Sequence, residues 1–247
     1  MKLITFSLWG MNPKYTQGAI KNAELAPEIY PGWKCRFYLG ASTPKPVEHQ
    51  LRKYDHVEVV NKPEWGDWRG MFWRFEPASE DDVEVMISRD CDSRLNKREA
   101  SAVEEWLKTD RGFHIMRDHP YHQFAVLGGM WGAKKGTVPR MKELIYEWGG
   151  GTDKYGTDYD FFVEKILPTM DQEVLMVHDE FFKGIPFPTP RQGLEFVGQV
   201  FDEEDRTLQE HLQILRRWYE DPGSSASPAA PGRRGGVLGT HKLTKAQ

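Results

Sequence analysis

Two spacings of apolar residues alternate along the first sixty positions of the chain. Short segments rich in apolar or β-branched residues, which predict strands, occur at 3–9, 34–40 and 56–61. Between them, residues 18–30 and 47–54 place their apolar side chains at the spacing of an amphipathic helix. Strands that alternate with helices predict a parallel sheet with right-handed crossovers, and hence an α/β fold.

The remaining elements continue this pattern. The predicted strands are 83–88, 113–118, 128–136 and 173–181, and the predicted helices are 97–109, 139–148 and 158–168, the last ended by Pro168. Residues 65–75 are too rich in glycine for a strand and gain helical character towards their end. We therefore expect one Rossmann-like domain over residues 1–220, with a mostly parallel central sheet flanked by helices. Residues 221–247 are rich in Pro, Gly, Ser and Ala, a composition that predicts a disordered tail.

Composition narrows the class of protein. The 247 residues carry a net charge of −4, which argues against a nucleic-acid binder held by a basic surface. Two cysteines cannot build a disulfide framework or a zinc site. The N-terminus lacks the pattern of a signal peptide, and no apolar run reaches the roughly 18 residues of a membrane span. We expect a soluble, cytoplasmic protein.

The clearest chemical signal is Asp90-Cys91-Asp92, directly after the predicted strand 83–88. Open α/β sheets bind ligands at the carboxyl ends of their strands, and two carboxylates one residue apart can reach the same cation. Oxygen ligands of this kind suit Mg²⁺ or Mn²⁺. The alternative interpretation is an Asx turn that only ends the strand.

Five segments, in this order, resemble the glycosyltransferases of the GT-A fold, in particular the small viral and bacterial enzymes that modify surface glycans. They are ISRDCDSRL (87–95), IMRDHPYH (115–122), GGMWGAKKG (128–136), YGTDYDFF (155–162) and VHDEF (177–181). The resemblance spans about residues 1–200. It implies transfer of a sugar from a nucleotide diphosphate donor, such as a UDP-sugar, to a hydroxyl of a glycan or glycoprotein acceptor.

The resemblance also implies roles for residues near the donor diphosphate. Asp90 and Asp92 would hold the divalent metal, with Asp90 also near the donor, and His178 would be the third ligand; a histidine bonded at a strand end is the alternative for His178. Arg69 or Arg74 would meet the phosphate charge, since guanidinium forks suit phosphate oxygens. The competing interpretation is a solvated helix face, or Arg74 paired with Glu76.

Further positions are implied around the sugar. Ser7, Leu8 and Trp9 would line the pocket for base and ribose, although Trp9 could equally be core. Asp118 would accept hydrogen bonds from the donor sugar, with a structural Asp–Arg pair as the alternative. Gly128 and Gly129 would let the backbone approach the sugar, or mark a β-bulge.

Catalysis at the anomeric carbon is expected from one more carboxylate. Asp158, with Asp160 in reserve, would point at the acceptor or the anomeric carbon. The alternative for Asp158 is an N-cap of the helix that follows.

Two other classes of protein remain open. Haloacid-dehalogenase-like phosphatases also begin from a strand ending in Asp-x-Asp, and Asp90 would then be the nucleophile. However, their motif usually stands near the N-terminus, and no convincing downstream lysine follows here. A glycan-binding module without catalysis is the third possibility.

Overall fold

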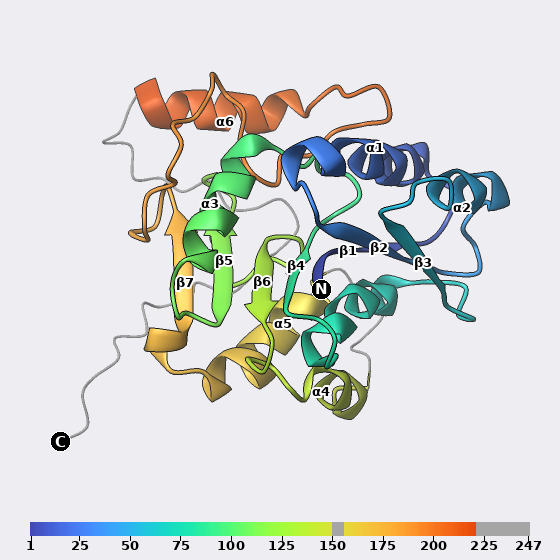
Figure 1. Ribbon diagram of the computed structural model, residues 1–247. Helices are drawn as coiled ribbons and strands as arrows, with labels where there is room; N and C mark the ends of the chain where they lie inside the picture. The colour runs from blue at the N-terminus through green and yellow to red at the C-terminus, as the bar shows by residue number, and fades with distance from the viewer. Residues whose placement is uncertain (150–155, 221–247) are drawn as a thin grey trace.

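The seven strands of the computed structural model join in one sheet, in the order β3-β2-β1-β4-β6-β5-β7 (Figure 1). They are β1 (Lys2–Leu8), β2 (Lys34–Leu39), β3 (Val57–Asn61), β4 (Val85–Ser88), β5 (Phe113–Arg117), β6 (Trp131–Lys134) and β7 (Leu175–Asp179). Only β6 runs against the others, pairing antiparallel with both β4 and β5. The structure describes residues 1–149 and 156–220, so the predicted tail 221–247 lies outside the described residues.

Helices cover both faces of the sheet (Figure 1). One side carries α1 (Pro13–Ile29), α2 (Lys45–Leu51), α3 (Lys97–Leu107) and α6 (Gln209–Glu220). The other carries the 3₁₀ helix η1 (Trp68–Ser79), α4 (Met141–Glu147) and α5 (Thr157–Phe161), which continues as the π-helix η2 (Phe162–Ile166) and the 3₁₀ turns η3 (Leu167–Thr169) and η4 (Gln172–Val174). The expected α/β fold with a mostly parallel sheet is confirmed.

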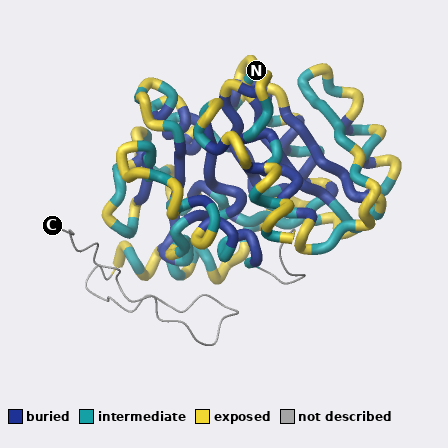
Figure 2. Tube along the Cα trace, turned by 90° about the horizontal axis from the view of Figure 1, so that it is seen from below, coloured by how far each residue is buried: buried dark blue, intermediate teal, exposed yellow. Residues whose placement is uncertain are grey.

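An apolar core lies on each face of the sheet, because successive side chains of a strand point to opposite faces. From β1, Ile4 and Phe6 enter the core beneath α1 and α3, whereas Leu3 enters the core beneath η1 and α4. Figure 2 shows the resulting pattern, with the buried strands in the middle of the molecule and exposed residues on the surrounding helices and loops.

Several element boundaries differ from the sequence prediction. Helix α1 begins at Pro13 rather than at residue 18, since the Asn12 side chain caps it by accepting a hydrogen bond from the Lys14 N–H (3.0 Å). Proline at the first helical position suits this start. The predicted helix 158–168 changes its hydrogen-bond pattern after Phe161, and Pro168 lies inside η3 rather than ending a helix. Helix α6 was not predicted.

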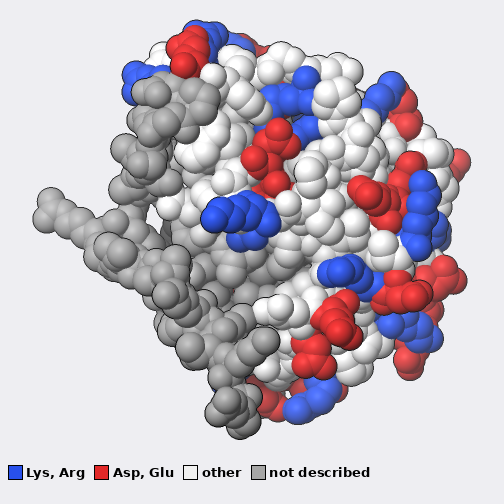
Figure 3. Space-filling view, turned by 90° about the vertical axis from the view of Figure 1, so that its left-hand side faces the viewer, with Lys and Arg blue, Asp and Glu red and all other residues white. Residues whose placement is uncertain are grey.

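The strand directions decide where a ligand site forms. The parallel strands end at one edge of the sheet, and the loops that follow β1, β4 and β5 therefore gather there. Within residues 1–149 and 156–220, no helix is both long and apolar enough to cross a membrane. The face shown in Figure 3 carries basic and acidic side chains intermixed.

Candidate active site

A cavity of about 660 Å³ opens at this edge of the sheet. Its walls come from the loop after β1, the 3₁₀ helix η1, the turn after β4, the β5–β6 connection, the start of α5 and residues 196–211. The charged side chains that line it in the described part of the chain are Arg74, Asp90, Asp92 and Asp158. Three of the expected carboxylates thus reach one cavity.

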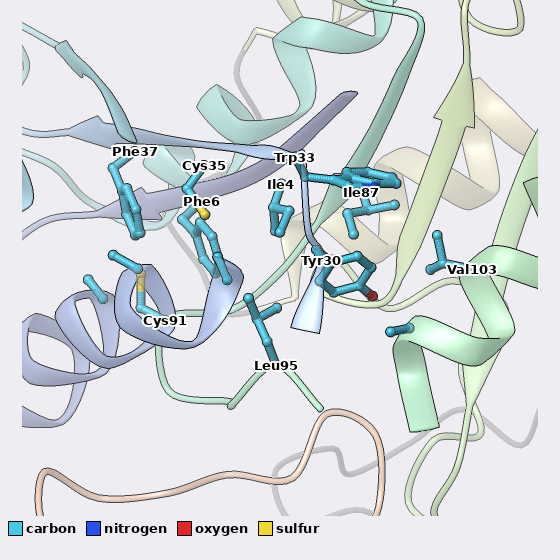
Figure 4. Packing of buried hydrophobic residues seen from close by; sticks show 14 of the residues in the cluster. Ile4, Phe6, Tyr30, Trp33, Cys35, Phe37, Ile87, Cys91, Leu95 and Val103 are labelled. Atoms are coloured by element: carbon cyan, nitrogen blue, oxygen red, sulfur yellow. The ribbon is translucent and has the colours of Figure 1, made fainter. Parts of the chain in front are cut away.

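The turn after β4 places both aspartates of the motif in the cavity. Cys91, between them, is buried in the apolar core, near Phe6 and Leu95 (Figure 4). Its Sγ donates a hydrogen bond to the Ser7 carbonyl (3.4 Å). A hydrogen bond from the Ser93 N–H to the Asp90 carbonyl (3.3 Å) closes this turn and holds the two aspartates at the cavity wall.

Arg74 connects two of the carboxylates. Its Nη1 forms an ion pair with Asp90 Oδ1 and donates to the Arg89 carbonyl (2.9 Å). Burial lowers the pKa of the Arg74 guanidinium, but Asp90 and Asp158 outweigh burial and raise it, so the group stays charged. The Arg74 Nε is buried without a hydrogen-bond partner among the described residues. A buried donor of this kind calls for an acceptor such as a ligand oxygen.

Two consecutive glycines make room for the carboxylates. A Cβ atom at Gly128 would lie 2.1 Å from Asp158 Oδ2 and 2.9 Å from Arg74 Nη2. A Cβ atom at Gly129 would lie 2.1 Å from Asp90 Oδ2. Asp158, Arg74 and Asp90 therefore converge over this dipeptide. The close approach expected of these glycines is made to the protein's own carboxylates.

Asp92 has a different partner. Its Oδ2 forms an ion pair with Lys14 Nζ at 2.7 Å, from the first turn of α1. Burial and the nearby charge of Asp90 raise the pKa of Asp92, and Lys14 opposes them. The aspartates of the motif thus lie in a region where negative charge is only partly offset, and a cation would relieve it.

Asp158 lies in the first turn of α5 but does not cap it. Gly156 occupies the N-cap position, and no side chain caps the helix there. Burial raises the pKa of Asp158, Arg74 opposes this shift, and Asp90 adds to it. The capping alternative for Asp158 is therefore wrong. Asp160 is not among the residues that line the cavity.

The residues expected around the nucleotide divide into two groups. Ser7, Leu8 and Trp9 all line the cavity, and the Ser7 Oγ accepts a hydrogen bond from the Arg74 backbone N–H (3.2 Å). Arg69 does not line it; its exposed guanidinium pairs with Asp67, the N-cap of η1. Of the two expected arginines, Arg74 is the one that the structure brings to the carboxylates.

Asp118 is not a cavity residue, contrary to expectation. Its fully buried carboxylate accepts hydrogen bonds from Arg98 Nε (2.9 Å), Arg191 Nη2 (2.6 Å) and the Val197 N–H (2.9 Å). This saturated cluster ties α3 to the segment around Val197. The assignment of Asp118 to the donor sugar is therefore corrected to the structural Asp–Arg alternative, with Arg98 and Arg191 as its partners.

The structure also separates His178 from the two aspartates. His178 is buried on β7, where its Nδ1 lies 2.7 Å from His114 Nε2 and its Nε2 lies 3.0 Å from Glu105 Oε2. Both ring nitrogens are thus engaged, and His178 does not line the cavity. The prediction that His178 is the third metal ligand is therefore wrong. No group of three or more His, Cys, Asp or Glu side chains suited to a metal occurs among residues 1–149 and 156–220.

Sequence reasoning missed two features of the site. Lys14 could have been found from Asn12-Pro13, a helix-start signal directly after the first strand. The other feature is a group of rings in the cavity lining, supplied by the β5–β6 connection, residue 196 and α6. Because these rings are spread over some ninety residues of the chain, no local sequence pattern predicts that they lie together.

Comparison with known proteins shows a similarity of fold only. No family model and no curated protein matches the sequence. Among solved structures, the chain is similar to 4-diphosphocytidyl-2C-methyl-D-erythritol synthase from Anaerococcus prevotii, at 10% identity and a TM-score of 0.51, covering 89% of this chain and 96% of that one.

Two glycosyltransferase structures show lower TM-scores. One, involved in the glycosylation of the major capsid of PBCV-1, has 13% identity and a TM-score of 0.48, with 72% of this chain and 81% of that chain covered. The galactosyltransferase LgtC has 11% identity and a TM-score of 0.42, with 66% and 69% covered. The mostly parallel sheet with its flanking helices, as expected from the sequence, is the fold shared with the synthase.

Proposed function

We propose that this chain transfers a sugar from a nucleotide diphosphate donor, such as a UDP-sugar, to a hydroxyl of a glycan or glycoprotein. The observation that carries the proposal is the convergence of Asp90, Asp92, Arg74 and Asp158 at one end of a cavity whose wall includes Ser7–Trp9. This end offers both a cation for phosphate oxygens and carboxylates for a metal, as a diphosphate leaving group requires.

The metal would be Mg²⁺ or Mn²⁺, held by Asp90 and Asp92. These two carboxylates would supply part of the oxygen ligands that such an ion takes, and oxygens from the donor phosphates and water would supply the rest. When bound, the metal neutralises charge on the departing diphosphate. It follows that the chain alone should bind the metal weakly, and much more tightly when the nucleotide is present.

The protein's own groups perform the remaining steps. Arg74, with its unpartnered Nε, binds the phosphate side of the donor. The bond between the anomeric carbon and the phosphate oxygen breaks, and the acceptor oxygen bonds to that carbon. Asp158 accepts the proton of the acceptor hydroxyl, a role that suits a buried carboxylate with a raised pKa.

The phosphatase alternative gains no support from the cavity. Its nucleophile would be Asp90, which here is paired with Arg74, and the lysine at the motif, Lys14, lies upstream in the chain and is paired with Asp92. A trapped aspartyl-phosphate at Asp90, detected by mass spectrometry with a phosphate mimic, would favour that class instead.

The test begins with a thermal-shift screen of nucleotide-sugars, each with and without Mn²⁺. We expect one donor to raise the melting temperature and to be hydrolysed slowly in the absence of acceptor. Binding without any hydrolysis or transfer would indicate the glycan-binding module instead. No binding of any nucleotide-sugar would overturn the proposal.

Asp158→Asn separates binding from catalysis. We expect donor affinity close to that of the wild type, because Asp90, Asp92 and Arg74 remain, and turnover lower by roughly 10²-fold or more. Transfer at the wild-type rate would remove Asp158 from the reaction.

A further inference from the structure

One part of the cavity lining has a different chemistry from the aspartates and Arg74. His119, Tyr121, His122, Phe196 and His211 line it, and we call these five residues the ring wall. The His119 ring lies 4.5 Å from Phe196, 5.4 Å from Tyr121 and His211, and 5.7 Å from His122, between ring centroids. The wall is therefore continuous, and it carries none of the four charged side chains that line the cavity.

The histidines of the ring wall are neutral at neutral pH. Burial lowers the pKa of His119 to about 4 and the pKa of His122 well below its usual range. Burial also lowers the pKa of His211, although Glu210 opposes the shift. A wall of uncharged rings gives an anionic ligand no favourable partner, whereas it suits the apolar face of an uncharged sugar.

His122 supplies a hydrogen-bond donor to this wall. Its Nδ1 accepts a hydrogen bond from the Asp118 backbone N–H (3.0 Å), which fixes the proton of the neutral ring on Nε2. Within residues 1–149 and 156–220 the ring makes no hydrogen bond other than this one, and His122 lines the cavity. His119 differs, because its Nδ1 accepts from Tyr121 N (3.1 Å) and its Nε2 donates to the His211 carbonyl (3.0 Å).

We propose that the ring wall is the subsite for an uncharged sugar unit of the acceptor, and that the Nε2–H of His122 donates a hydrogen bond to one of its hydroxyl oxygens. The inference rests on the proposed function, since it assigns the charged side chains of the cavity to the donor and its uncharged rings to the acceptor. It selects neutral saccharides over uronic acids, sialic acids and sugar phosphates.

Two substitutions isolate this hydrogen bond. The amide oxygen of His122→Asn can replace Nδ1 as acceptor for the Asp118 N–H, but the variant lacks a group at the Nε2 position. In His122→Gln the longer side chain can place its amide donor near that position. We expect both variants to have melting temperatures close to that of the wild type. A loss of binding in His122→Asn alone would then reflect the missing contact with the ligand and not a change in the fold.

The probes are methyl glycosides of neutral hexoses, with methyl glucuronoside as the charged comparison. Binding is measured by saturation-transfer NMR on the full chain with UDP and Mg²⁺ present. We expect at least one neutral glycoside to bind, the glucuronoside to bind at least fivefold more weakly, and His122→Asn to weaken the neutral ligand about fivefold, the scale of one hydrogen bond. His122→Gln should stay within about twofold of the wild type.

Two results would overturn the inference. One is a glucuronoside that binds as well as the neutral glycosides, and the other is a His122→Asn variant that binds them as the wild type does. If no glycoside binds although UDP-sugars do, the ring-wall inference fails while the proposed function stands. If UDP-sugars also fail to bind, the proposed function falls first.

Discussion

The same dipeptide, Arg-Asp, stands at the ends of two strands of this protein, and the two pairs behave in opposite ways. After β4, Arg89 is buried against Glu99 (3.0 Å), and Asp90 faces the cavity. At the end of β5, Arg117 pairs with Asp179 (3.0 Å), and Asp118 directly after the strand is buried. One dipeptide thus directs its aspartate into the cavity, and the other directs it into the protein interior.

The two aspartates differ in how fully their carboxylates are hydrogen-bonded within the protein. Asp118 has three donors from α3 and the segment around Val197, which leave no capacity for a substrate. The Asp90 side chain is 47% exposed, and its partner Arg74 retains an unpartnered Nε. A carboxylate at the end of a strand therefore becomes a site only where the neighbouring elements leave it incomplete.

The largest expected effect is on stability. Asp118→Asn should lower the free energy of unfolding by about 3–5 kcal/mol, because Arg191 loses its buried partner and Arg98 keeps only Glu180. Asp90→Asn should cost less, because its position is half-exposed and Asp158 remains beside Arg74. Urea denaturation of both variants measures the difference; equal losses would show that the two aspartates are equivalent.

The next effect sharpens the role of the glycine beside Asp90. A methyl group in Gly129→Ala would contact Asp90 Oδ2 and displace the carboxylate, so donor affinity should fall about tenfold or more. In an Asp90→Asn background the same change should weaken binding much less, because the loss acts through the carboxylate. Calorimetric titration of the wild type, the two single variants and the double variant measures the coupling between the two positions. Strictly additive losses of donor affinity would contradict an effect that acts through the carboxylate.

Stability should also fall as the pH is lowered, because buried histidines resist protonation. Burial lowers the pKa of His114 and His122 well below 6.5 and the pKa of His119 to about 4. Since the unfolded chain binds these protons first, the histidines stabilise the fold above pH 6.5 and that contribution is lost as the pH falls towards 4.

Between pH 6.5 and 5, each such histidine contributes a slope of up to about 1.4 kcal/mol per pH unit. His119→Asn retains an acceptor for the Tyr121 N–H but cannot take up a proton. Its unfolding free energy should therefore fall less steeply with acid than that of the wild type, and an unchanged slope would contradict a buried neutral His119.

The smallest expected effect concerns Arg69. Its ion pair with Asp67 is exposed and distant from the cavity lining, so Arg69→Ala should change donor affinity less than twofold and stability by less than about 1 kcal/mol. Arg74→Ala should weaken donor binding at least tenfold in the same titration. Similar losses of donor affinity in Arg69→Ala and Arg74→Ala would show that both arginines of η1 contribute to phosphate binding.

The sequence predicted the fold class well because its signals are local. Buried strands and amphipathic helices appear as short runs with fixed spacing, and the order β-α-β-α-β follows from them. The start of α1 and the transition from α5 to a π-helix were missed, since they depend on a cap at Asn12 and on packing of Phe161 and Phe162 in the core.

Site residues were predictable only where the local chain fixes their direction. Asp90 and Asp92 follow from a buried strand and the burial of Cys91 between them. Asp118 and His178 also stand at strand ends, but their directions depend on Arg98, Arg191, His114 and Glu105, which come from other elements. No pattern within one segment contains that information.

The central claim is that Asp90 and Asp92 form the cation-assisted binding site for a nucleotide diphosphate. Calorimetric titration of UDP into the wild type and into Asp92→Asn, each with and without Mn²⁺, tests it most directly. We predict that Mn²⁺ tightens binding to the wild type at least tenfold and has no effect on Asp92→Asn. Equal UDP affinity with and without Mn²⁺ in the wild type, or an Mn²⁺ effect that persists in Asp92→Asn, would contradict the account.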